Sequence, residues 1–256
     1  MPLNRRQLLK IIAAGAASSL LTSPILSQAS VRPKIKAIAF DAFPIFDPRP
    51  IFGLTKKLFP EQGEVLGKLW FTKIFGYTWL RTSGEQYKNF YAVIDDALLF
   101  SAKKLKLDLT SEKHEQLINV WLALKIWPDV KPALQYLKEK NIRLGFLSNM
   151  TEEMLRTNAK NSGIEEMFEF YLSTDKAQAF KPDPRAYQLG VDAFGLPKEN
   201  IAFTAFAGWD ASGASWFGYP TIWVNRLNLV EENLGVSPHF TGKGMKNLLK
   251  FIERQT

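Results

Sequence analysis

A series of short apolar runs constrains the fold of this chain more than any other feature of its sequence. Short apolar runs bounded by polar residues are typical of strands that are buried on both faces of a parallel sheet. The runs are Lys36–Phe40, Arg143–Leu147, Phe168–Leu172, Ile201–Ala205 and Thr221–Val224. Asp41 follows the first run directly, and Ser148-Asn149 follows the second. The runs therefore predict the strands of a buried sheet, with polar residues at their ends.

Helical patterns lie between these runs. Asp129–Lys140 carries apolar residues at helical spacing, and Asp183-Pro184 combines an N-cap residue with proline at the first helical position. Strands that alternate with helices indicate an α/β fold with a doubly wound parallel sheet. Ligands of such sheets bind beyond the carboxyl ends of the strands, where Asp41 and Ser148-Asn149 are expected to lie.

Residues 50–127 interrupt the alternation, because they contain no convincing strand pattern. They contain amphipathic helical segments such as Tyr87–Leu105 and Glu112–Leu124. A crossover between parallel strands needs only about a dozen residues, so this stretch is much longer than the connection requires. We therefore predict a core built from residues 31–49 and 128–256, with a helical cap over 50–127 that excludes water from the strand ends.

Residues 1–30 have the order of an export signal. Arg5-Arg6 precede an apolar stretch from Ile11 to Leu21, and Ser27-Gln28-Ala29 offers a cleavage site between small residues. This order is typical of a secretory signal peptide, and the paired arginines resemble the twin-arginine signal. We predict export of the folded protein to the periplasm, with an uncleaved membrane anchor as the alternative. No other stretch approaches transmembrane length, so no stable membrane span is expected after processing.

The composition excludes several kinds of site. The chain of 256 residues has no cysteine, which excludes disulfides, cysteine-ligated metal sites and a thiol nucleophile. His114 and His239 are too few for a histidine-rich metal site, and we predict neither a metal nor a cofactor. The formal charge of +8 falls to +5 without residues 1–30, which hold three bases and no acid. This modest excess is spread along the chain, so no nucleic-acid partner is expected.

Asp41, at the end of the first predicted strand, can act as a nucleophile through its carboxylate. A carboxylate is a weak nucleophile in water, so it needs partial desolvation and a cation that orients it. Lys181 is the candidate for this cation. A role for Asp41 as a turn or cap residue stays open on composition alone, but the motifs around Lys181 and Asp210 favour catalysis.

Four motifs occur in a fixed order along the chain. They are Phe40–Asp47 (FDAFPIFD), Leu147–Asn149 (LSN), Lys181–Tyr187 (KPDPRAY) and Trp209–Ala214 (WDASGA). Together with Tyr77–Arg81 (YTWLR) in the cap, they resemble the haloacid dehalogenase superfamily, and within it the L-2-haloacid dehalogenases. The resemblance covers about residues 34–250. It implies a core of this superfamily's α/β type with an inserted cap.

The resemblance also implies roles for individual residues. The implied catalytic residues are Asp41, Lys181 and Asp210, and the implied substrate-binding residues are Arg81, Ser148, Asn149, Tyr187, Trp209, Ala42 and Phe43. Arg81 and Asn149 would hold the departing halide, with Trp209 as an aromatic wall. Ser148 would bind the substrate carboxylate, and Tyr187 would support Lys181 through its hydroxyl.

Structural roles for the same residues stay open. Arg81 could be a solvated cap residue, and Ser148 could cap the helix that begins near Thr151. Tyr187 could serve by packing its ring, and Asp210 could be an N-cap. The tryptophans Trp70 and Trp121 are expected in the core of the cap rather than around a substrate.

Phe43, two positions after the nucleophile, indicates the reaction class. Phosphatases of the superfamily carry a second aspartate there, which protonates the leaving group and neighbours a bound Mg²⁺. A phenyl ring can do neither. Because a halide leaves without a proton, Phe43 favours metal-independent displacement at a carbon–halogen bond and disfavours phosphoryl transfer.

Several polar positions of the family are apolar here. Pro44-Ile45 replace a glycine and a threonine after the nucleophile, and Ala205 and Ala207 replace a serine and an asparagine ahead of Trp209. In the family these groups orient the nucleophile and the hydrolytic water. Loss of one preorganised donor typically costs about 10²–10³ in rate. Attack by Asp41 is therefore expected to survive while ester hydrolysis slows.

Three functions remain as hypotheses. In the first, an (S)-2-haloacid dehalogenase-like hydrolase, Asp41 displaces halide from a small 2-haloalkanoic acid, and water cleaves the aspartyl ester to give a 2-hydroxy acid. The second is a non-catalytic relative that binds a small anion or a partner, and the loss of polar residues favours it. The third is a phosphatase of the same fold, which Phe43 opposes. The expected ligands are the halo acid and halide, and the family's tendency to dimerise makes a homodimer the expected assembly.

Overall fold

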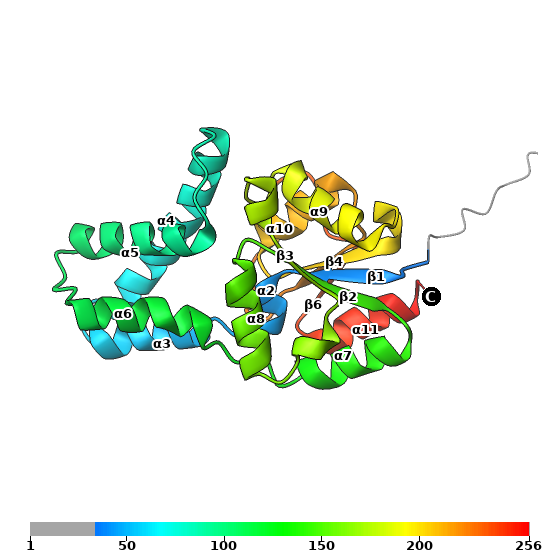
Figure 1. Cartoon of the computed structure of the whole chain (residues 1–256), viewed down its shortest axis with the longest axis horizontal. Helices are drawn as coiled ribbons and strands as arrows, with labels where there is room; N and C mark the ends of the chain where they lie inside the picture. The colour runs from blue at the N-terminus through cyan, green and yellow to red at the C-terminus, as the bar shows by residue number, and fades with distance from the viewer. Residues whose placement is uncertain (1–33, 256) are drawn as a thin grey trace, which may run out of the picture. The chain divides into compact units, whose positions relative to one another are not determined.

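A parallel sheet lies at the centre of the computed structural model, which describes residues 34–255. Its strand order is β3-β2-β1-β4-β5-β6 (Figure 1). The strands are β1 (Ala37–Phe40), β2 (Arg143–Ser148), β3 (Phe170–Ser173), β4 (Ile201–Ala205), β5 (Thr221–Val224) and β6 (Phe240–Gly242). All neighbouring strands pair in parallel, so the predicted doubly wound α/β sheet is confirmed. The predicted export signal over residues 1–30 lies outside the described residues.

The order of the strands reverses at β1. The chain moves outward from β1 through β2 to β3, and then returns to the other side of β1 at β4. Phe40, the last residue of β1, is in register with Phe146 of β2 and Thr204 of β4. The backbone N–H of Asp41 then donates to the carbonyl of Thr204 at 3.0 Å. Asp41 therefore lies at the switch point where doubly wound sheets bind ligands.

The two faces of the sheet are covered by different helices. The helices are α7 (Val130–Glu139), α8 (Glu152–Asn161), α9 (Pro184–Phe194), α10 (Gly208–Phe217) and α11 (Met245–Glu253). Ile38 and Phe40 of β1 pack in a buried cluster with residues of α7, α8 and α11, whereas Ala37 and Ala39 pack in a second cluster with α9 and α10. Figure 1 shows α9 and α10 on one side of the sheet and α7 and α11 on the other. Because both faces are buried, the strands are apolar throughout, as the runs predict.

Helices fill the connection from β1 to β2. They are α2 (Ala42–Ile45), α3 (Arg49–Leu58), α4 (Gly63–Ser83), α5 (Phe90–Lys104), α6 (Ser111–Asn119) and the 3₁₀ turn η1 (Val120–Leu122). Residues 50–127, predicted as the cap, contain no strand, and an isolated bridge pairs Phe46 with Ile126. Figure 1 shows α3 to α6 grouped beside the sheet-bearing part of the chain. Trp70 and Trp121 are completely buried, as expected.

Some element boundaries differ from the sequence-based expectation. The helix expected over Glu112–Leu124 ends at Asn119 and continues as η1, and the third strand begins at Phe170 rather than Phe168. The edge strand β6 was not expected, because it has three residues and none of them is fully buried. Short, half-exposed edges carry no continuous apolar run by which to recognise them.

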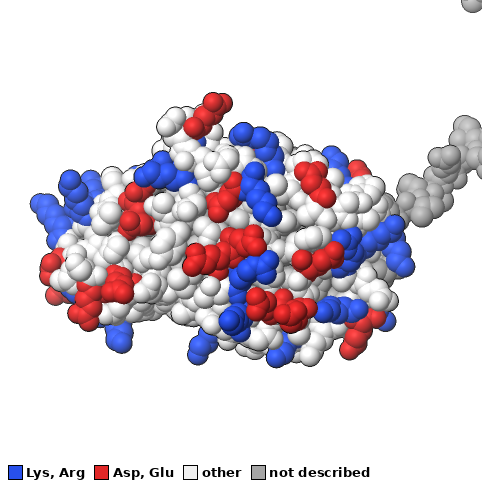
Figure 2. Space-filling view, in the orientation of Figure 1, with Lys and Arg blue, Asp and Glu red and all other residues white. Residues whose placement is uncertain are grey.

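Charged residues of both signs are interspersed on the face of the molecule that Figure 2 shows. On this face the basic side chains form no continuous stripe. None of the helices within residues 34–255 is both long and apolar enough to cross a bilayer.

Asn158 of α8 holds the segment through which the chain returns from the cap to the core. Its side chain is fully buried. Its Oδ1 accepts from the backbone N–H of Leu124 at 2.8 Å, and its Nδ2 donates to the carbonyls of Trp121 at 2.8 Å and Met154 at 2.9 Å. One amide group thus satisfies backbone groups that the turn η1 leaves without partners of its own.

We expect Asn158→Ala to lower the free energy of unfolding by about 3 kcal/mol, because buried backbone groups of Trp121 and Leu124 lose their partners. Urea denaturation measures the change. The matched control is Asn161→Ala, whose exposed side chain donates to the carbonyl of Leu122 at 3.2 Å. The control should cost less than about 0.5 kcal/mol. Equal losses in the two variants would contradict this account of Asn158.

Candidate active site

A buried lysine joins two carboxylates beyond the ends of β1 and β4. Lys181 Nζ donates to Asp41 Oδ1 at 2.9 Å and to Asp210 Oδ2 at 2.7 Å. The exposed fractions of the side chains are 1% for Lys181, 13% for Asp41 and 2% for Asp210. Buried charges are stable only when they are paired and hydrogen-bonded, and this cluster meets both conditions. The structure therefore brings together the three residues predicted to be catalytic.

Asp41 is oriented by groups on both of its oxygens. It is the N-cap of α2, so its Oδ2 accepts from the backbone N–H of Phe43 at 3.2 Å. Its Oδ1 accepts from Ser148 Oγ at 3.2 Å as well as from Lys181. The cap role and the candidate catalytic role are thus compatible, because the same bonds fix the direction of the carboxylate.

Asp210 lies in the first turn of α10 and is not its N-cap, which is Ala207. Tyr187 Oη donates to Asp210 Oδ1 at 2.7 Å, and Tyr219 Oη donates to the carbonyl of Tyr187 at 2.7 Å. The hydroxyl of Tyr187 thus reaches Lys181 through the carboxylate of Asp210, which bonds to both. A Cβ on Gly213 would come within 2.5 Å of Tyr187 Oη, so the tyrosine reaches Asp210 only because this position is glycine.

Burial and charge shift the pKa values of this cluster. Burial raises the pKa of Asp210 to about 6, because the ionised carboxylate loses its solvation; Lys181 opposes this shift and Asp41 adds to it. Burial lowers the pKa of Lys181, but the negative charges of Asp210 and Asp41 outweigh it and raise that pKa above its ordinary value. Burial, together with Asp210, holds the pKa of Tyr187 well above 10. Lys181 is therefore a cation and Tyr187 a hydrogen-bond donor at neutral pH.

Ser148 is the last residue of β2 and Asn149 follows it, so both lie at the same strand ends. Ser148 accepts from the backbone N–H of Met150 at 3.3 Å, whereas the N-cap of α8 is Thr151. Asn149 Oδ1 accepts from the backbone N–H of Lys181 at 3.0 Å. Its Nδ2 is buried and has no hydrogen-bond partner among the described residues. Since buried amide groups normally have partners, this N–H group is available to a ligand.

Aromatic rings from the core and the cap enclose Phe43, two positions after Asp41. The ring of Phe43 lies 6.4 Å from Phe71 of α4, 6.3 Å from Trp121 of η1 and 5.7 Å from Phe206, measured between centroids. Phe43 itself is 8% exposed, and its neighbour Ala42 is 1% exposed. We call Phe43, Phe71, Trp121 and Phe206 the aromatic enclosure. Phe71 and Phe206 could not be assigned to the site from sequence, because an apolar residue in a helix or loop carries no signal that separates a site wall from core.

Trp209 closes a second contact between cap and core. Its ring centroid lies 5.3 Å from that of Phe75 and 5.6 Å from that of Trp79, both on α4. The predicted aromatic wall is therefore packed against the cap. Aromatic pairs at these distances stabilise the contact beyond the area that they bury.

Arg81 is not brought to the cluster. Its guanidinium donates to Asp96 Oδ2 at 2.7 Å and to the carbonyl of Gln86 at 3.1 Å, both in the cap. Arg81 follows Phe71 by ten positions on α4, which corresponds to about 15 Å along a helix. Since Phe71 is the α4 residue that packs against Phe43, the geometry does not support the predicted halide-binding role of Arg81.

The apolar replacements are packed into the core. Ile45 and Ala205 are fully buried, each in a different one of the two hydrophobic clusters. Ala207 caps α10 without a side-chain hydrogen bond. These positions therefore offer Asp41 and Asp210 no hydroxyl or amide group.

Within residues 34–255 no three side chains of His, Asp or Glu gather as a metal site would need. The ammonium of Lys181 lies between the two buried carboxylates, where it bonds to both. The residues of the cluster therefore fit a lysine-bridged site rather than a bound cation.

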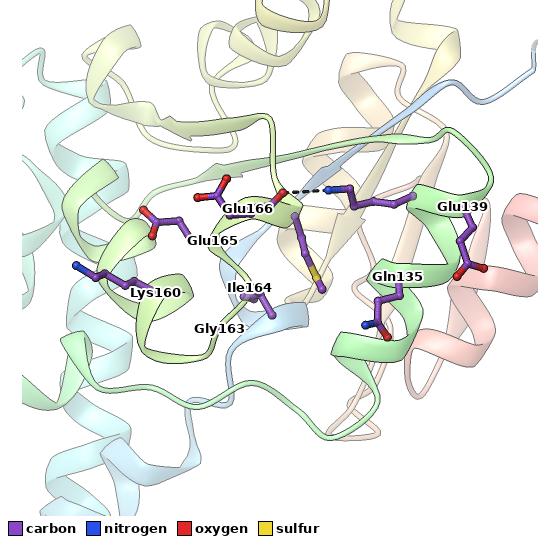
Figure 3. Close-up of a pocket in the computed structure, with 9 residues that line it drawn as sticks. Gln135, Glu139, Lys160, Gly163, Ile164, Glu165 and Glu166 are labelled. Carbon is purple, nitrogen blue, oxygen red and sulfur yellow. Dashed lines mark hydrogen bonds between the residues drawn. The ribbon is translucent and has the colours of Figure 1, made fainter.

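The cavity drawn in Figure 3 lies elsewhere on the molecule. Its volume is about 560 Å³. It is lined by Gln135, Lys138, Glu139, Lys160, Gly163, Ile164, Glu165, Glu166 and Met167. These residues precede β2 and β3, and Lys138 Nζ donates to the carbonyl of Glu166 at 3.0 Å. The cavity is therefore at the amino ends of the strands, and none of the predicted site residues lines it.

Comparisons of sequence agree with this site. The family model "haloacid dehalogenase-like hydrolase" matches residues 73–218, which is more than half of the chain. The chain is 37% identical over 220 residues to haloacetate dehalogenase H-2 of Moraxella sp. (strain B), and the match covers 86% of this chain and 98% of that protein.

Solved structures are similar over the same part of the chain. An L-2-haloacid dehalogenase of 37% identity has a TM-score of 0.84, covering 86% of this chain and 99% of that one. The L-2-haloacid dehalogenase of Xanthobacter autotrophicus with chloropropionic acid covalently bound has a TM-score of 0.80 at 25% identity, covering 87% of this chain and 100% of that one. With its lysine-bridged carboxylates at the strand ends and these matches, the chain belongs to the haloacid dehalogenase-like hydrolase family.

Proposed function

We propose that this protein is a hydrolase that removes halide from a small 2-haloalkanoic acid, with Asp41 as the nucleophile. The observation that carries the proposal is the buried carboxylate of Asp41, held by Lys181 and Ser148 at the switch point of the sheet. The names of the relatives, which are haloacetate and 2-haloacid dehalogenases, support this substrate class. They favour it over the binding-protein and phosphatase alternatives.

In the first half of the reaction, Asp41 attacks the carbon that bears the halogen. A carboxylate oxygen forms the new carbon–oxygen bond, the carbon–halogen bond breaks, and its electron pair leaves with the halide. Lys181 and Ser148 fix the direction of the carboxylate, while its burial removes water that would solvate the charge. Phe43 supports this chemistry, because no proton has to reach a departing halide.

In the second half, water cleaves the aspartyl ester. The water oxygen adds to the carboxyl carbon of Asp41 as Asp210 accepts a proton, and collapse of the adduct breaks the ester bond. The proton passes from Asp210 to the departing alkoxide, which leaves as the 2-hydroxy acid. Asp41 then loses its own proton, so that halo acid and water give hydroxy acid, halide and one proton. Lys181 keeps both carboxylates in place throughout.

We expect Asp41→Asn to reduce halide release from 2-chloropropionate by about 10³-fold or more, because an amide is a much poorer nucleophile. Chloride release, measured with the purified protein in the absence of added metal, tests this. Asp192→Asn, at an exposed position that accepts from Gln188, is the matched control and should keep the wild-type rate. Wild-type halide release that persists in Asp41→Asn would remove Asp41 from the mechanism.

The pH dependence of turnover should report on Asp210. Only the ionised carboxylate can accept the proton of water, and its raised pKa of about 6 means that it is protonated below that pH. Steady-state turnover should therefore fall about tenfold per pH unit below pH about 6, and level off above it. Measurement of kcat from pH 4.5 to 8 gives the midpoint. A midpoint near the ordinary aspartate pKa of about 4 would contradict the role of burial at Asp210.

We further propose that the protein is exported through the twin-arginine route to the periplasm. The order of charges and apolar residues in 1–30 supports this localisation. Replacement of Arg5 and Arg6 by lysine keeps the charge and removes the paired arginines, so export of the full chain should be lost. Immunodetection in periplasmic and cytoplasmic fractions measures it, with Lys10→Arg as control. Undiminished export of the double variant would refute the twin-arginine route.

A further inference from the structure

Two buried N–H groups lack hydrogen-bond partners among the described residues. They are Asn149 Nδ2 and Trp121 Nε1. Nearly all buried donors in folded proteins are paired, so each exception needs an explanation. Asn149 already belongs to the predicted halide site, whereas Trp121 is expected only as cap core.

Trp121 differs from the other buried tryptophans in this respect. Trp70 Nε1 donates to the carbonyl of Ile94 at 2.8 Å, Trp127 Nε1 to Phe43 at 3.0 Å, and Trp223 Nε1 to Phe206 at 2.9 Å. The buried amide of Asn158 fixes the backbone of Trp121, because its Nδ2 donates to the Trp121 carbonyl. The unpaired indole N–H is thus a property of a rigid, fully buried residue.

The ring of Trp121 is part of the enclosure beside the nucleophile. It packs at 5.4 Å against Phe71, nearly parallel to it, and at 6.3 Å against Phe43. Phe43 in turn donates its backbone N–H to Asp41. Trp121 is therefore in ring contact with Phe43, the residue whose backbone bonds to the carboxylate of Asp41.

A departing halide needs hydrogen-bond donors where its charge develops. The guanidinium of Arg81 is engaged by Asp96 and Gln86, as described above. Phe43 and Phe71 can contribute only the weakly positive edges of their rings. An indole N–H inside such an enclosure is a neutral donor in a medium of low dielectric, where a hydrogen bond to an anion is strong.

We propose that Trp121 binds the departing halide through its indole N–H, together with the free amide N–H of Asn149. This inference rests on the proposed dehalogenation and assigns a further residue to it. Trp121 stabilises the charge that develops on the halogen as its bond to carbon breaks. The dependence on the N–H should be strongest for chloride, the smallest and most basic of the common leaving halides, and weakest for iodide.

Trp121→Phe tests the proposal, because it removes the N–H and keeps an aromatic ring. We expect kcat/KM for 2-chloropropionate to fall about 10- to 100-fold, the loss of one hydrogen bond to a charged group, and to fall much less for 2-iodopropionate. The inhibition constant of added bromide should rise as well. The melting temperature should fall as well, since the smaller ring leaves a cavity in place of a fully buried indole, so stability alone does not test the proposal. Trp70→Phe is the matched control: it loses a paired N–H, so its melting temperature should fall while its preference among halogens stays that of the wild type.

Other outcomes overturn the proposal. Unchanged kcat/KM and bromide inhibition in Trp121→Phe would leave Trp121 a packing residue. An equal loss of kcat/KM with chloro, bromo and iodo substrates would show that the ring supports the fold rather than the halide.

Direct detection of halide separates this inference from the proposed function. Crystals of the wild-type protein in bromide should show an anomalous peak within hydrogen-bond distance of Trp121 Nε1, and the peak should be absent in Trp121→Phe. A peak without any halide release from substrates would refute dehalogenation and keep the anion site. Halide release without the peak would refute the anion site alone.

Discussion

The arrangement of the whole site depends on one buried ammonium that is shared by two carboxylates. Lys181 bonds to Asp41 and Asp210, which come from the ends of different segments, so the strands must be in register for the three charges to meet. Two negative charges and one positive charge in a buried place leave an excess of negative charge. Burial raises the pKa of Asp210 and the negative charge of Asp41 adds to this shift, while Lys181 and the hydroxyl of Tyr187 oppose it. Removal of one member would leave a buried charge unpaired and would strongly destabilise the fold. The same three residues therefore serve both stability and the proposed chemistry.

The aromatic enclosure places apolar rings beside the segment that carries Asp41. Phe71 and Trp121 belong to the cap and Phe43 and Phe206 to the core, and the other three rings pack around Phe43, two positions after Asp41. Because each turn of a helix places a side chain on the same face, a helical cap can present aromatic rings at several positions along its contact with the core. The same packing that stabilises the contact of cap and core therefore lowers the dielectric near Asp41, and electrostatic interactions become stronger there.

The fold and the centre of the site could be predicted from the sequence, whereas the cap side of the site could not. Apolar runs locate buried strands, and polar residues at their carboxyl ends must converge, so Asp41, Ser148 and Asn149 could be placed from sequence alone. The catalytic roles assigned to them stay predictions. The halide-binding role predicted for Arg81 is not supported, because a motif on a long helix does not reveal which turn of that helix faces the strand ends. β6 escaped recognition because its three residues are partly exposed.

The loss of polar groups around Asp41 affects the two halves of the reaction differently. Displacement of halide needs an oriented carboxylate, and Lys181, Ser148 and the backbone of Phe43 supply three donors to it. Hydrolysis also needs a positioned water, and the buried Ile45 and Ala205 can donate or accept nothing through their side chains. Both oxygens of Asp210 are already bonded, one to Lys181 and one to Tyr187, so a water must share an occupied oxygen. The geometry therefore favours fast alkylation of Asp41 by the substrate and slow hydrolysis of the resulting aspartyl ester.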